Sequence, residues 1–228
     1  MRTFVIGDIH GAAKAFSQCL ERASFDPQTD ELICLGDVCD GWPETNKCIE
    51  MLLDLDKLVI VLGNHDQMTL DWARKGILND VWLNQGGAQT IESYPDGMPS
   101  HHIRFLSEAP FYHVRENKLF VHAGIQPNKP LQEQGPDIFL WNRDLFYEAL
   151  HAKQNDDPIE FPPFDEIYIG HSPIHQYGWL EPVLSGNVWL MDTGAAWQGT
   201  LSMMDIHSKE KFVSDPVMDM YPPGSGRF

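Results

Sequence analysis

Five short apolar runs in the sequence end in turns that combine small residues with Asp, Asn or His. The turns are Gly7-Asp8-Ile9-His10, Gly36-Asp37, Gly63-Asn64-His65-Asp66, His122-Ala123-Gly124 and Gly170-His171. These polar side chains offer hard and borderline donor atoms, which suit Mn, Fe, Zn or Mg better than metals that select thiolates. A single turn of this kind is most often an ordinary turn or helix cap. Five of them in one chain indicate a shared metal site.

Such a donor set supports a particular chemistry when one carboxylate bridges two cations. Cations about 3.5–4 Å apart hold both an attacking water and the oxygens of a phosphoryl group. Their charge also inverts the local field, so an acidic chain can still attract an anionic substrate at that point. The donor set therefore favours the hydrolysis of phosphate esters.

The composition is typical of an ordinary globular protein. Hydrophobic residues make up 43% and charged residues 21% of the 228 residues, so neither intrinsic disorder nor a fibrous repeat fits. Sixteen Lys and Arg against 33 Asp and Glu leave a formal net charge of −17. This balance argues against a broad electrostatic contact with nucleic acid or with an anionic membrane. We expect neither nucleic acid nor a membrane among the partners.

The apolar runs and the cysteines bear on the compartment. The chain opens MRTFVIGDIHG, which passes from a short apolar run straight into polar residues and does not have the usual form of a signal peptide. No stretch approaches the roughly 18 apolar residues of a membrane span. The four cysteines lack CxxC spacing, which is typical of buried structural thiols in a reducing compartment. These features predict a cytoplasmic protein.

In the first half of the chain, the polar turns follow strands that alternate with helices. We expect strands at residues 2–6, 31–35 and 58–62, and helices at residues 12–23, 44–55 and 66–74. Continuous apolar runs separated by helices are typical of parallel strands that are buried on both faces. Ligands bind beyond the carboxyl ends of such strands, so polar residues that are distant in sequence converge there. The first half is therefore predicted to be α/β.

The pattern changes in the second half. Apolar and polar residues alternate from residue 111, and Glu116-Asn117 is a plausible hairpin turn that opens a second sheet. Further along we expect a helix at residues 138–151, a buried strand at 166–169 and late antiparallel strands at 188–191 and 200–206.

No linker divides the sequence, so residues 1–228 are expected to form a single domain. Within it, residues 76–110 are less regular and are expected to form a cap-like segment of short helices. Residues 221–228 are rich in Pro and Gly and are expected to be a loosely ordered tail.

Taken together, the turns resemble the ordered motifs of a known family, the phosphoprotein phosphatases within the calcineurin-like metallophosphoesterases. The similar segments are Gly7-Asp8-Ile9-His10-Gly11, Gly36-Asp37-Val38-Cys39-Asp40-Gly41, Gly63-Asn64-His65-Asp66, His122-Ala123-Gly124 and Gly170-His171. Residues 82–87, 141–144 and 192–195 are similar to features of its bacterial and phage serine/threonine phosphatase-like members. The resemblance implies the calcineurin-like metallophosphoesterase fold, an α/β (in some classifications α+β) arrangement in which helices sandwich two central mixed β-sheets in four layers (αββα).

The resemblance also implies how the metal ligands are divided. Asp8, His10 and Asp37 are expected to hold one metal, and Asp37, Asn64, His122 and His171 the other, with Asp37 as the bridge. We expect two divalent ions, manganese in vitro, with iron, zinc or magnesium as alternatives. A hydroxide between the ions attacks phosphorus in line without a covalent enzyme intermediate, because two cations lower the pKa of bound water.

Three more residues are expected to act beside the metals. By the resemblance, His65 is the general acid toward the leaving oxygen, and Asp40 orients its ring and favours the protonated form. Arg143 is the candidate phosphate clamp, because a guanidinium binds two phosphoryl oxygens at once. The alternative for Arg143 is a surface helix charge paired with Asp144 or Glu148.

Some positions depart from the family pattern. Eukaryotic protein phosphatases typically have arginine where this chain has Gly41 and Leu62, so two phosphate-binding guanidiniums are missing at those places. Asp66 stands where those enzymes usually have Glu, and residues 62–66 are closer to the symmetrical dinucleoside tetraphosphatases. The usual substrate class is therefore open.

Three functions follow from these features. The first is a metal-dependent phosphatase that hydrolyses phosphomonoesters, either phosphoserine, phosphothreonine or phosphotyrosine in proteins or small aryl phosphates. The second is a hydrolase of dinucleoside polyphosphates of the Ap4A type. The third is a non-catalytic metal-binding scaffold, against which the presence of His65, Asp40 and all six expected ligands argues. A panel of phosphopeptide, aryl phosphate and diadenosine tetraphosphate distinguishes them.

Overall fold

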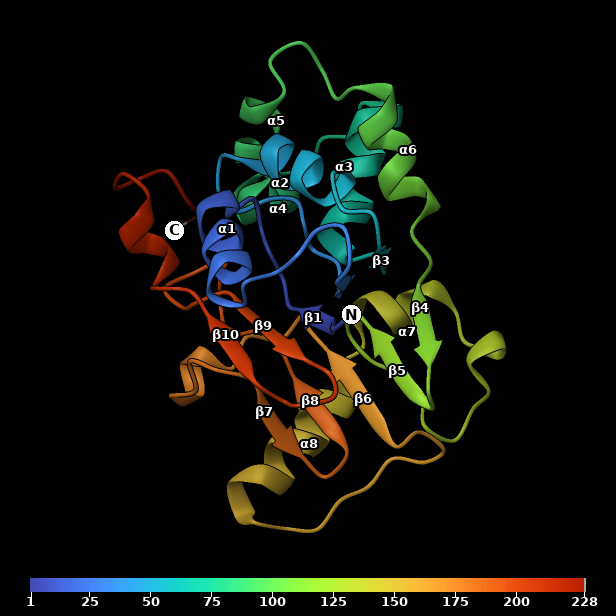
Figure 1. Ribbon diagram of the computed structural model, residues 1–228. Coiled ribbons are helices and arrows are strands. Elements are labelled where there is room, and N and C mark those ends of the chain that lie inside the picture. Colours follow the sequence, from blue (N-terminus) through green and yellow to red (C-terminus); the bar gives the residue numbers. More distant parts are fainter. Residues whose placement is uncertain (228) are drawn as a thin grey trace.

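Two β-sheets lie at the centre of the computed structural model, which describes residues 1–227 (Figure 1). Their strand orders are β10-β9-β1-β2-β3 and β4-β5-β6-β8-β7. The strands are β1 (Thr3–Ile6), β2 (Glu31–Cys34), β3 (Leu58–Ile60), β9 (Ser202–Asp205) and β10 (Lys211–Val213) in the first sheet and β4 (Tyr112–Arg115), β5 (Lys118–Val121), β6 (Glu166–Ile169), β7 (Val183–Ser185) and β8 (Val188–Leu190) in the second.

Helices connect the parallel strands and cover the sheets. They are α1 (Ala13–Arg22), α2 (Thr45–Leu53), α3 (Asn64–Lys75), α4 (Asp80–Trp82), α5 (Ala88–Ser93), α6 (Ser100–Glu108), α7 (Pro136–Trp141) and α8 (Asp144–Asn155), with the short turns η1 (Leu83–Gly87), η2 (Leu131–Glu133), η3 (His175–Tyr177) and η4 (Val217–Met220). No helix among residues 1–227 is both long and apolar enough to cross a bilayer.

The pairing of the strands makes both sheets mixed. In the first sheet β1, β2 and β3 are parallel, and β9 and β10 join antiparallel beside β1. In the second, β5, β6 and β8 are parallel, with β4 and β7 as antiparallel edge strands. Glu116 and Asn117 have φ of 51° and 56° and form the expected hairpin turn.

Some expectations for the second half were wrong. The strand at residues 188–191 runs parallel to β6, as buried apolar strands do, and is antiparallel only to β7. The strands β7 and β10 were not expected, because each has three residues and a weak apolar pattern. The helix expected at residues 138–151 is two helices: Asn142 is extended (φ −70°, ψ 125°), and its side chain accepts the N–H of Asp144 (3.1 Å), which starts α8.

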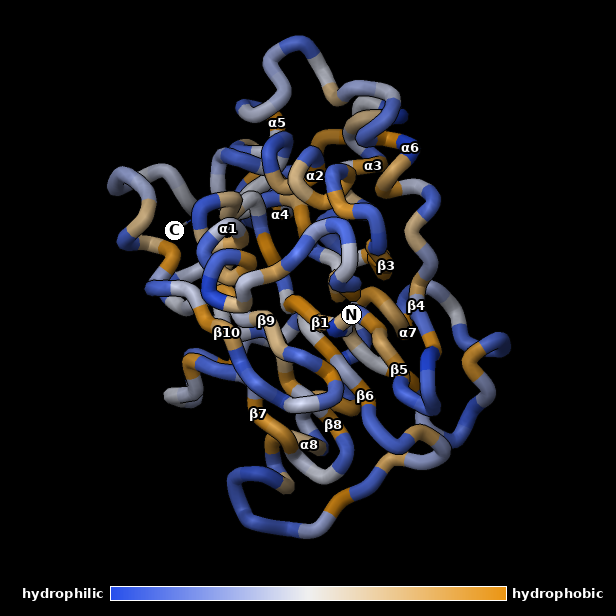
Figure 2. The backbone as a smooth tube through the Cα atoms, in the orientation of Figure 1, coloured by the Kyte–Doolittle hydropathy of each residue, from blue (hydrophilic) through white to orange (hydrophobic). Residues whose placement is uncertain are grey.

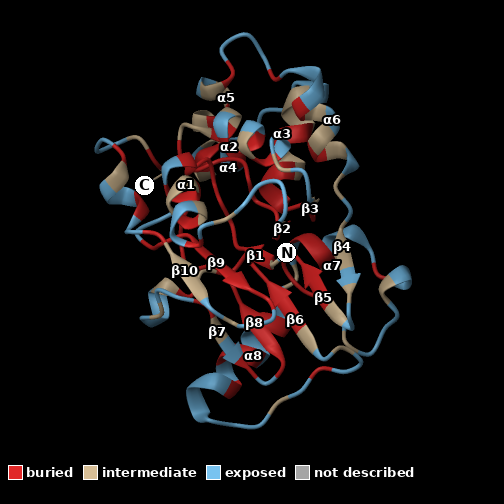
Figure 3. Cartoon of the chain, in the orientation of Figure 1, coloured by how far each residue is buried: buried red, intermediate tan, exposed pale blue. Residues whose placement is uncertain are grey.

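Three apolar clusters define the layers. One lies between the sheets, and the other two join the outer face of each sheet to its helices. The inner cluster includes the rings of Phe120 and Tyr168, whose centroids are 4.8 Å apart in a stacked pair. Figure 2 shows the central strands as hydrophobic, and Figure 3 shows the same strands as buried. The order helix, sheet, sheet, helix confirms the four-layer fold.

Two segments with irregular sequences are well defined in the structure. Residues 76–110 contain α4, η1, α5 and α6, and α5 and α6 contact α2 and α3. Loose order at residues 221–228 stays a prediction; within residues 221–227, the ring of Tyr221 stacks on Trp42, with the ring centroids 4.9 Å apart. Phe228 lies outside the described residues.

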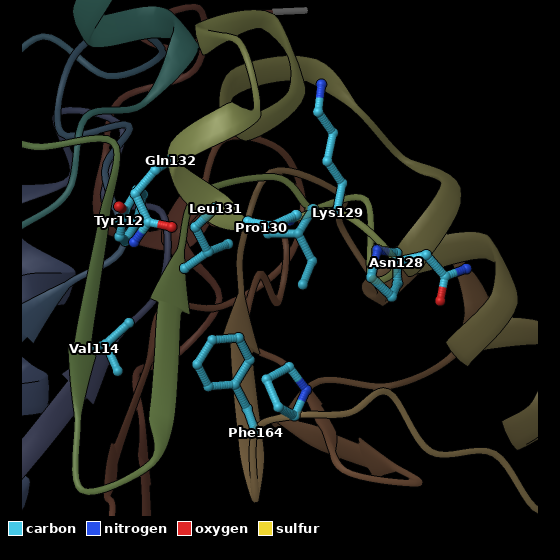
Figure 4. Close-up of a pocket in the computed structure, with 11 residues that line it drawn as sticks. Tyr112, Val114, Asn128, Lys129, Pro130, Leu131, Gln132 and Phe164 are labelled. Atoms are coloured by element: carbon cyan, nitrogen blue, oxygen red, sulfur yellow. The ribbon is translucent and has the colours of Figure 1, made fainter.

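A hollow of about 650 Å³ lies beside the β4–β5 hairpin (Figure 4). Tyr112 and Val114 of β4, the loop around Leu131 and the ring of Phe164 line it. None of the polar residues from the five turns contributes to its wall. The hollow is therefore separate from the candidate chemistry.

The start of β1 is tied to the turn before β2 by an ion pair. The Arg2 backbone N–H and Nε donate to the Asp30 carboxylate at 2.9 and 3.1 Å. Burial raises the pKa of Asp30, but the hydrogen bonds from Arg2 outweigh it and hold the pKa below its usual value. A carboxylate with a lowered folded-state pKa adds stability above its unfolded pKa of about 3.9, and that stability is lost as the pH falls through the folded value.

Asp30→Asn is accordingly expected to lower the free energy of unfolding by about 1–2 kcal/mol at pH 7, since Arg2 is partly exposed and the pair partly screened. The difference from wild type should shrink as the pH falls from about 5 toward 2. Urea denaturation across this pH range measures it, with the exposed Asp96→Asn as the matched control. A loss of unfolding free energy that stays constant down to the lowest pH would show that the charge of Asp30 is not its cause.

Candidate active site

The five polar turns lie at the carboxyl ends of β1, β2, β3, β5 and β6. Six side chains from these turns are buried, with at most 7% of their surface exposed: Asp8, His10, Asp37, Asn64, His122 and His171. Donor atoms within 4.8 Å of one another form two groups, one of His10, Asp37 and His65 and one of Asp37, His122 and His171. These groups contain four of the six predicted ligands together with His65, and Asp37 belongs to both. Asp8 is in neither group, although its Oδ2 lies 3.8 Å from His10 Nε2.

The site is divided between the two sheets. Asp8, His10, Asp37 and Asn64 follow strands of the first sheet, whereas His122 and His171 follow β5 and β6 of the second. The Asp8 carboxylate crosses this boundary and accepts the backbone N–H of His171 at 3.0 Å. Both sheets therefore set the geometry of the site.

Strained backbone directs several of these side chains. His10, Asp37, Asp40 and His171 have φ of 52°, 48°, 70° and 63°, in the left-handed region. Residues other than glycine pay about 1–3 kcal/mol each for such conformations, which cluster at functional sites. The surrounding contacts must hold these turns in place.

Two glycines allow the turns to approach one another. A Cβ on Gly63 would lie 2.2 Å from Asp37 Oδ1, and one on Gly170 would lie 2.1 Å from Asp8 Oδ1. Both distances are far below contact, so any side chain at these positions would displace a carboxylate of the site.

Helix α3 begins earlier than expected, at Asn64 instead of residue 66, and so carries Asn64 and His65 on its first turn. Asp66 fixes this start, because its carboxylate accepts the N–H of Gly63 (3.1 Å) as well as those of Val38 (2.9 Å) and Cys39 (3.1 Å). Asp66 thereby joins the turn after β2 to the turn after β3.

Hydrogen bonds to carbonyl groups select the ring tautomers of two histidines. His122 Nδ1 lies 2.8 Å from Leu35 O, and His10 Nδ1 lies 3.1 Å from Cys39 O. A carbonyl only accepts, so each Nδ1 carries the proton and each neutral ring presents its Nε2 lone pair. His122 Nε2 then faces Asn64 Oδ1 at 2.9 Å. At this distance the imidazole nitrogen and the amide oxygen can share a proton or bind one cation together.

The electrostatics of the pocket also fit a cation. Burial lowers the pKa of His122, but Asp37 and Asp8 outweigh this effect and raise the pKa to about 10. Without a metal, the His122 ring is therefore protonated and supplies the positive charge itself. Burial and the charge of His122 lower the pKa of His171 to about 2. Its buried Nε2 has no hydrogen-bond partner among residues 1–227. A neutral imidazole with an unpaired nitrogen is a good metal ligand.

A third carboxylate, Asp192, adds to the negative charge. Asp192 follows β8 and is 5% exposed. Burial raises its pKa to about 6, and the charge of Asp37 adds to the shift. Asp192 was not expected among the site residues, although it lies just after the buried strand β8, as the predicted ligands lie just after other buried strands. The donor set and this charge excess together fit divalent cations.

His65, which also belongs to the first donor group, forms a buried pair with Asp40. His65 Nδ1 lies 2.7 Å from Asp40 Oδ2, which leaves Nε2 free to face the site. The same carboxylate accepts Trp82 Nε1 at 2.8 Å and the hydroxyl of Thr90 at 2.8 Å, with that of Thr69 at 3.3 Å. These donors fix the carboxylate, which in turn fixes the imidazole ring.

A sequence model described as calcineurin-like phosphoesterase matches residues 1–197. The chain belongs to the calcineurin-like phosphoesterase family. Its members are two-metal hydrolases, and the two donor groups around Asp37 suit that chemistry. The family predicted from the motifs is thus confirmed, and so is the prediction that the chain is a hydrolase.

Relatives of this phosphoesterase have more than one named activity. It is 28% identical to serine/threonine-protein phosphatase 1 of Salmonella typhimurium, over 89% of this chain and 91% of the relative. It is 31% identical to a symmetrical bis(5'-nucleosyl)-tetraphosphatase of Pseudomonas fluorescens, over 93% of this chain and 94% of the relative. The crystal structure of a metallophosphoesterase from Sphaerobacter thermophilus has the same fold, with a TM-score of 0.58, 17% identity and coverage of 94% and 87%.

Arg143 of the phosphoesterase lies at the break between α7 and α8. It is exposed and forms no ion pair with Asp144, Glu148 or any other carboxylate of residues 1–227, so the alternative expected for it is not seen. Its charge contributes to the lowered pKa of His171. The neighbouring Trp141 packs edge-on against the His171 ring at 6.0 Å.

The two positions that lack the family arginines have other roles here. Leu62 is 4% exposed in the apolar cluster of the first sheet, and Gly41 packs against His10 with φ of 88°. A different cation, Arg227, reaches the phosphoesterase site and was not expected. Its position in the sequence gives no signal, because it depends on tertiary contacts.

The bond from Trp82 to Asp40 leads to a testable effect. Trp82→Phe keeps most of the buried ring but removes the donor to Asp40, so His65 is held less firmly. We expect a loss in kcat of about 10-fold, the size typical when a supporting hydrogen bond of an active site is removed. Steady-state kinetics on an aryl phosphate measure it.

Trp72→Phe is the matched control, because the ring of Trp72 packs against Trp82 at 5.9 Å and makes no bond to Asp40. If both variants lose activity equally, packing and not the hydrogen bond is responsible.

Proposed function

We propose that this phosphoesterase is a two-metal phosphomonoesterase that acts on phosphoserine, phosphothreonine or phosphotyrosine in proteins and on small aryl phosphates. The observation that carries the proposal is the pair of buried donor groups that share Asp37, one of which includes His65, the partner of Asp40. A scaffold without turnover has no use for an oriented proton donor at this place, so the arrangement favours an enzyme.

In this proposal the buried ligands divide into two sets. Asp8, His10 and Asp37 hold one ion, and Asp37, Asn64, His122 and His171 hold the other. The ions, manganese in vitro with iron, zinc or magnesium as alternatives, supply an activated water and neutralise the phosphoryl oxygens. The carbonyl groups that accept the Nδ1 protons of His122 and His10 leave each Nε2 available to bind an ion.

The proposed proton donor is His65. Asp40 accepts from Nδ1, so the proton on Nε2 is the one that reaches the leaving oxygen. Arg143, which is exposed and unpaired, is proposed to bind phosphoryl oxygens at the mouth of the site.

The Salmonella phosphatase aligns along most of this chain without long insertions, which supports phosphomonoesters as the first candidate. The alignment with the Salmonella phosphatase has 211 positions, whereas that with the Pseudomonas tetraphosphatase has 279, more than the 228 residues of this chain. The tetraphosphatase therefore carries insertions that this chain lacks. Dinucleoside polyphosphate hydrolysis is the second candidate, because several relatives have that name and residues 62–66 resemble theirs.

A substrate panel tests the proposal. The protein is stripped of metal, reloaded with each cation in turn, and assayed on a phosphopeptide, an aryl phosphate and diadenosine tetraphosphate. We expect metal-dependent release of phosphate from the first two, and a higher kcat/KM for them than for the dinucleotide. The reverse preference would favour the second candidate, and no hydrolysis with any cation would leave only the scaffold.

A further inference from the structure

The segment after β10 returns to the active site. In Figure 1 this red segment passes α1, which η4 contacts. Tyr221 then stacks on Trp42, with ring centroids 4.9 Å apart, and its hydroxyl donates to Glu44 at 2.6 Å. Trp42 is itself fixed, because its Nε1 donates to Ala195 O at 2.7 Å. The segment is thus anchored beside the turn that carries Asp40.

The anchored segment delivers the guanidinium of Arg227 to the site. Its Cζ lies 4.2 Å from the centroid of the Trp197 ring, and Nη1 donates to Gln85 O at 2.8 Å. The same Nη1 lies 3.4 Å from His65 Nε2, the atom proposed to donate the proton. Arg227 therefore lies next to the place that the leaving oxygen of a substrate would take.

Most of the hydrogen-bonding capacity of Arg227 is not used. A guanidinium has five N–H donors, and the Gln85 carbonyl takes one of them. The Nε atom is buried and has no partner among residues 1–227. A buried donor on a charged group is costly to leave unpaired, so this edge of the guanidinium requires an acceptor.

The charges around Arg227 point to an anionic acceptor in a metal-loaded site. Burial lowers its pKa, while Asp37, Asp192 and Asp40 oppose that effect, and arginine stays charged. When cations neutralise these carboxylates, the carboxylates no longer offset the cost of burying the charged guanidinium. A phosphoryl group supplies both negative charge and several acceptor oxygens, and a guanidinium edge fits two of them at once.

We propose that Arg227 binds phosphoryl oxygens of the substrate and holds them beside His65 Nε2. The inference rests on the proposed function. Contact with Trp197 fixes the plane of the guanidinium, so little side-chain freedom is lost on binding. Arg143 acts on His171 and Arg227 adjoins His65, so the two arginines serve different parts of the site.

Equilibrium binding of inorganic phosphate to the manganese-loaded full chain tests the inference. Arg227→Gln is expected to raise the Kd for phosphate by about 10–100-fold, as expected for a lost pair of charged hydrogen bonds. Arg227→Lys should recover only part of the affinity, because an ammonium lacks the two-donor edge. KM for an aryl phosphate should rise in parallel, while manganese stoichiometry and the melting temperature stay at wild-type values. The exposed Arg104→Gln is the matched control.

Two results would overturn the assignment. A Kd for phosphate in Arg227→Gln equal to that of wild type would exclude contact with the phosphoryl group. A lower Kd or KM in that variant would instead make Arg227 an internal blocker of the site. Failure of the proposed function is distinguishable, because wild-type protein would then bind manganese but neither bind phosphate nor hydrolyse esters.

Discussion

Asp37→Asn is expected to abolish turnover, with a loss of at least about 10³-fold, and to reduce bound manganese below two ions per chain. Asp37 belongs to both donor groups, so removal of its charge weakens both ions at once. Its carboxylate also accepts the backbone N–H of His65 at 2.9 Å, a bond that an amide oxygen can still accept. The local fold should therefore survive.

The measurement combines metal analysis by mass spectrometry with kcat on an aryl phosphate. Asp192→Asn is the matched control, because it removes the same charge from the same pocket at a residue outside both donor groups. We expect this variant to keep more bound metal and more activity than Asp37→Asn. Equal losses in both variants would mean that total charge, and not a shared ligand, holds the ions.

His65→Asn is expected to lower kcat by about 10²–10⁴-fold while both ions stay bound, because a general acid contributes about that much. The effect should depend on the leaving group. An aryl phosphate with an acidic phenol needs less proton donation than an alkyl phosphate, so the variant should lose most activity on the alkyl ester. Asp40→Asn should shift activity in the same direction, since it releases the His65 ring.

His175→Asn is the matched control for His65, because His175 is a partly buried histidine close in sequence to His171, and Gly194 packs against its ring. Its kcat should stay close to that of wild type. Full activity of His65→Asn on the alkyl phosphate, or loss of metal from that variant, would contradict the role assigned to His65.

Residues at the ends of buried strands were predictable from the sequence. Asp8, Asp37 and His122 each follow a continuous apolar run, and parallel strands bring their carboxyl ends to one edge. This rule, together with the family motifs, was enough to place all six candidate ligands in one pocket. It applies equally to Asp192 after β8, which was mentioned only as part of a similar segment.

Residues that reach the site through tertiary packing were not predictable. Trp82 and Asp40 are 42 residues apart, and Arg227 and His65 are 162 residues apart. The periodicity of the sequence carries no information on such long-range contacts. The Pro- and Gly-rich composition of residues 221–228 predicts loose order and gives no sign that Tyr221 stacks on Trp42. Short edge strands such as β10 were missed because three residues carry too little pattern.

The division of the ligands between the two sheets has a consequence for folding. Four candidate ligands follow strands of one sheet and two follow strands of the other. Two metal ions bound there would therefore connect the two sheets. A ligand that binds only the folded chain stabilises it by mass action. Chelators would therefore loosen the docking of the two sheets at the same time as they remove the catalytic centre, and resistance to heat would follow the supply of metal.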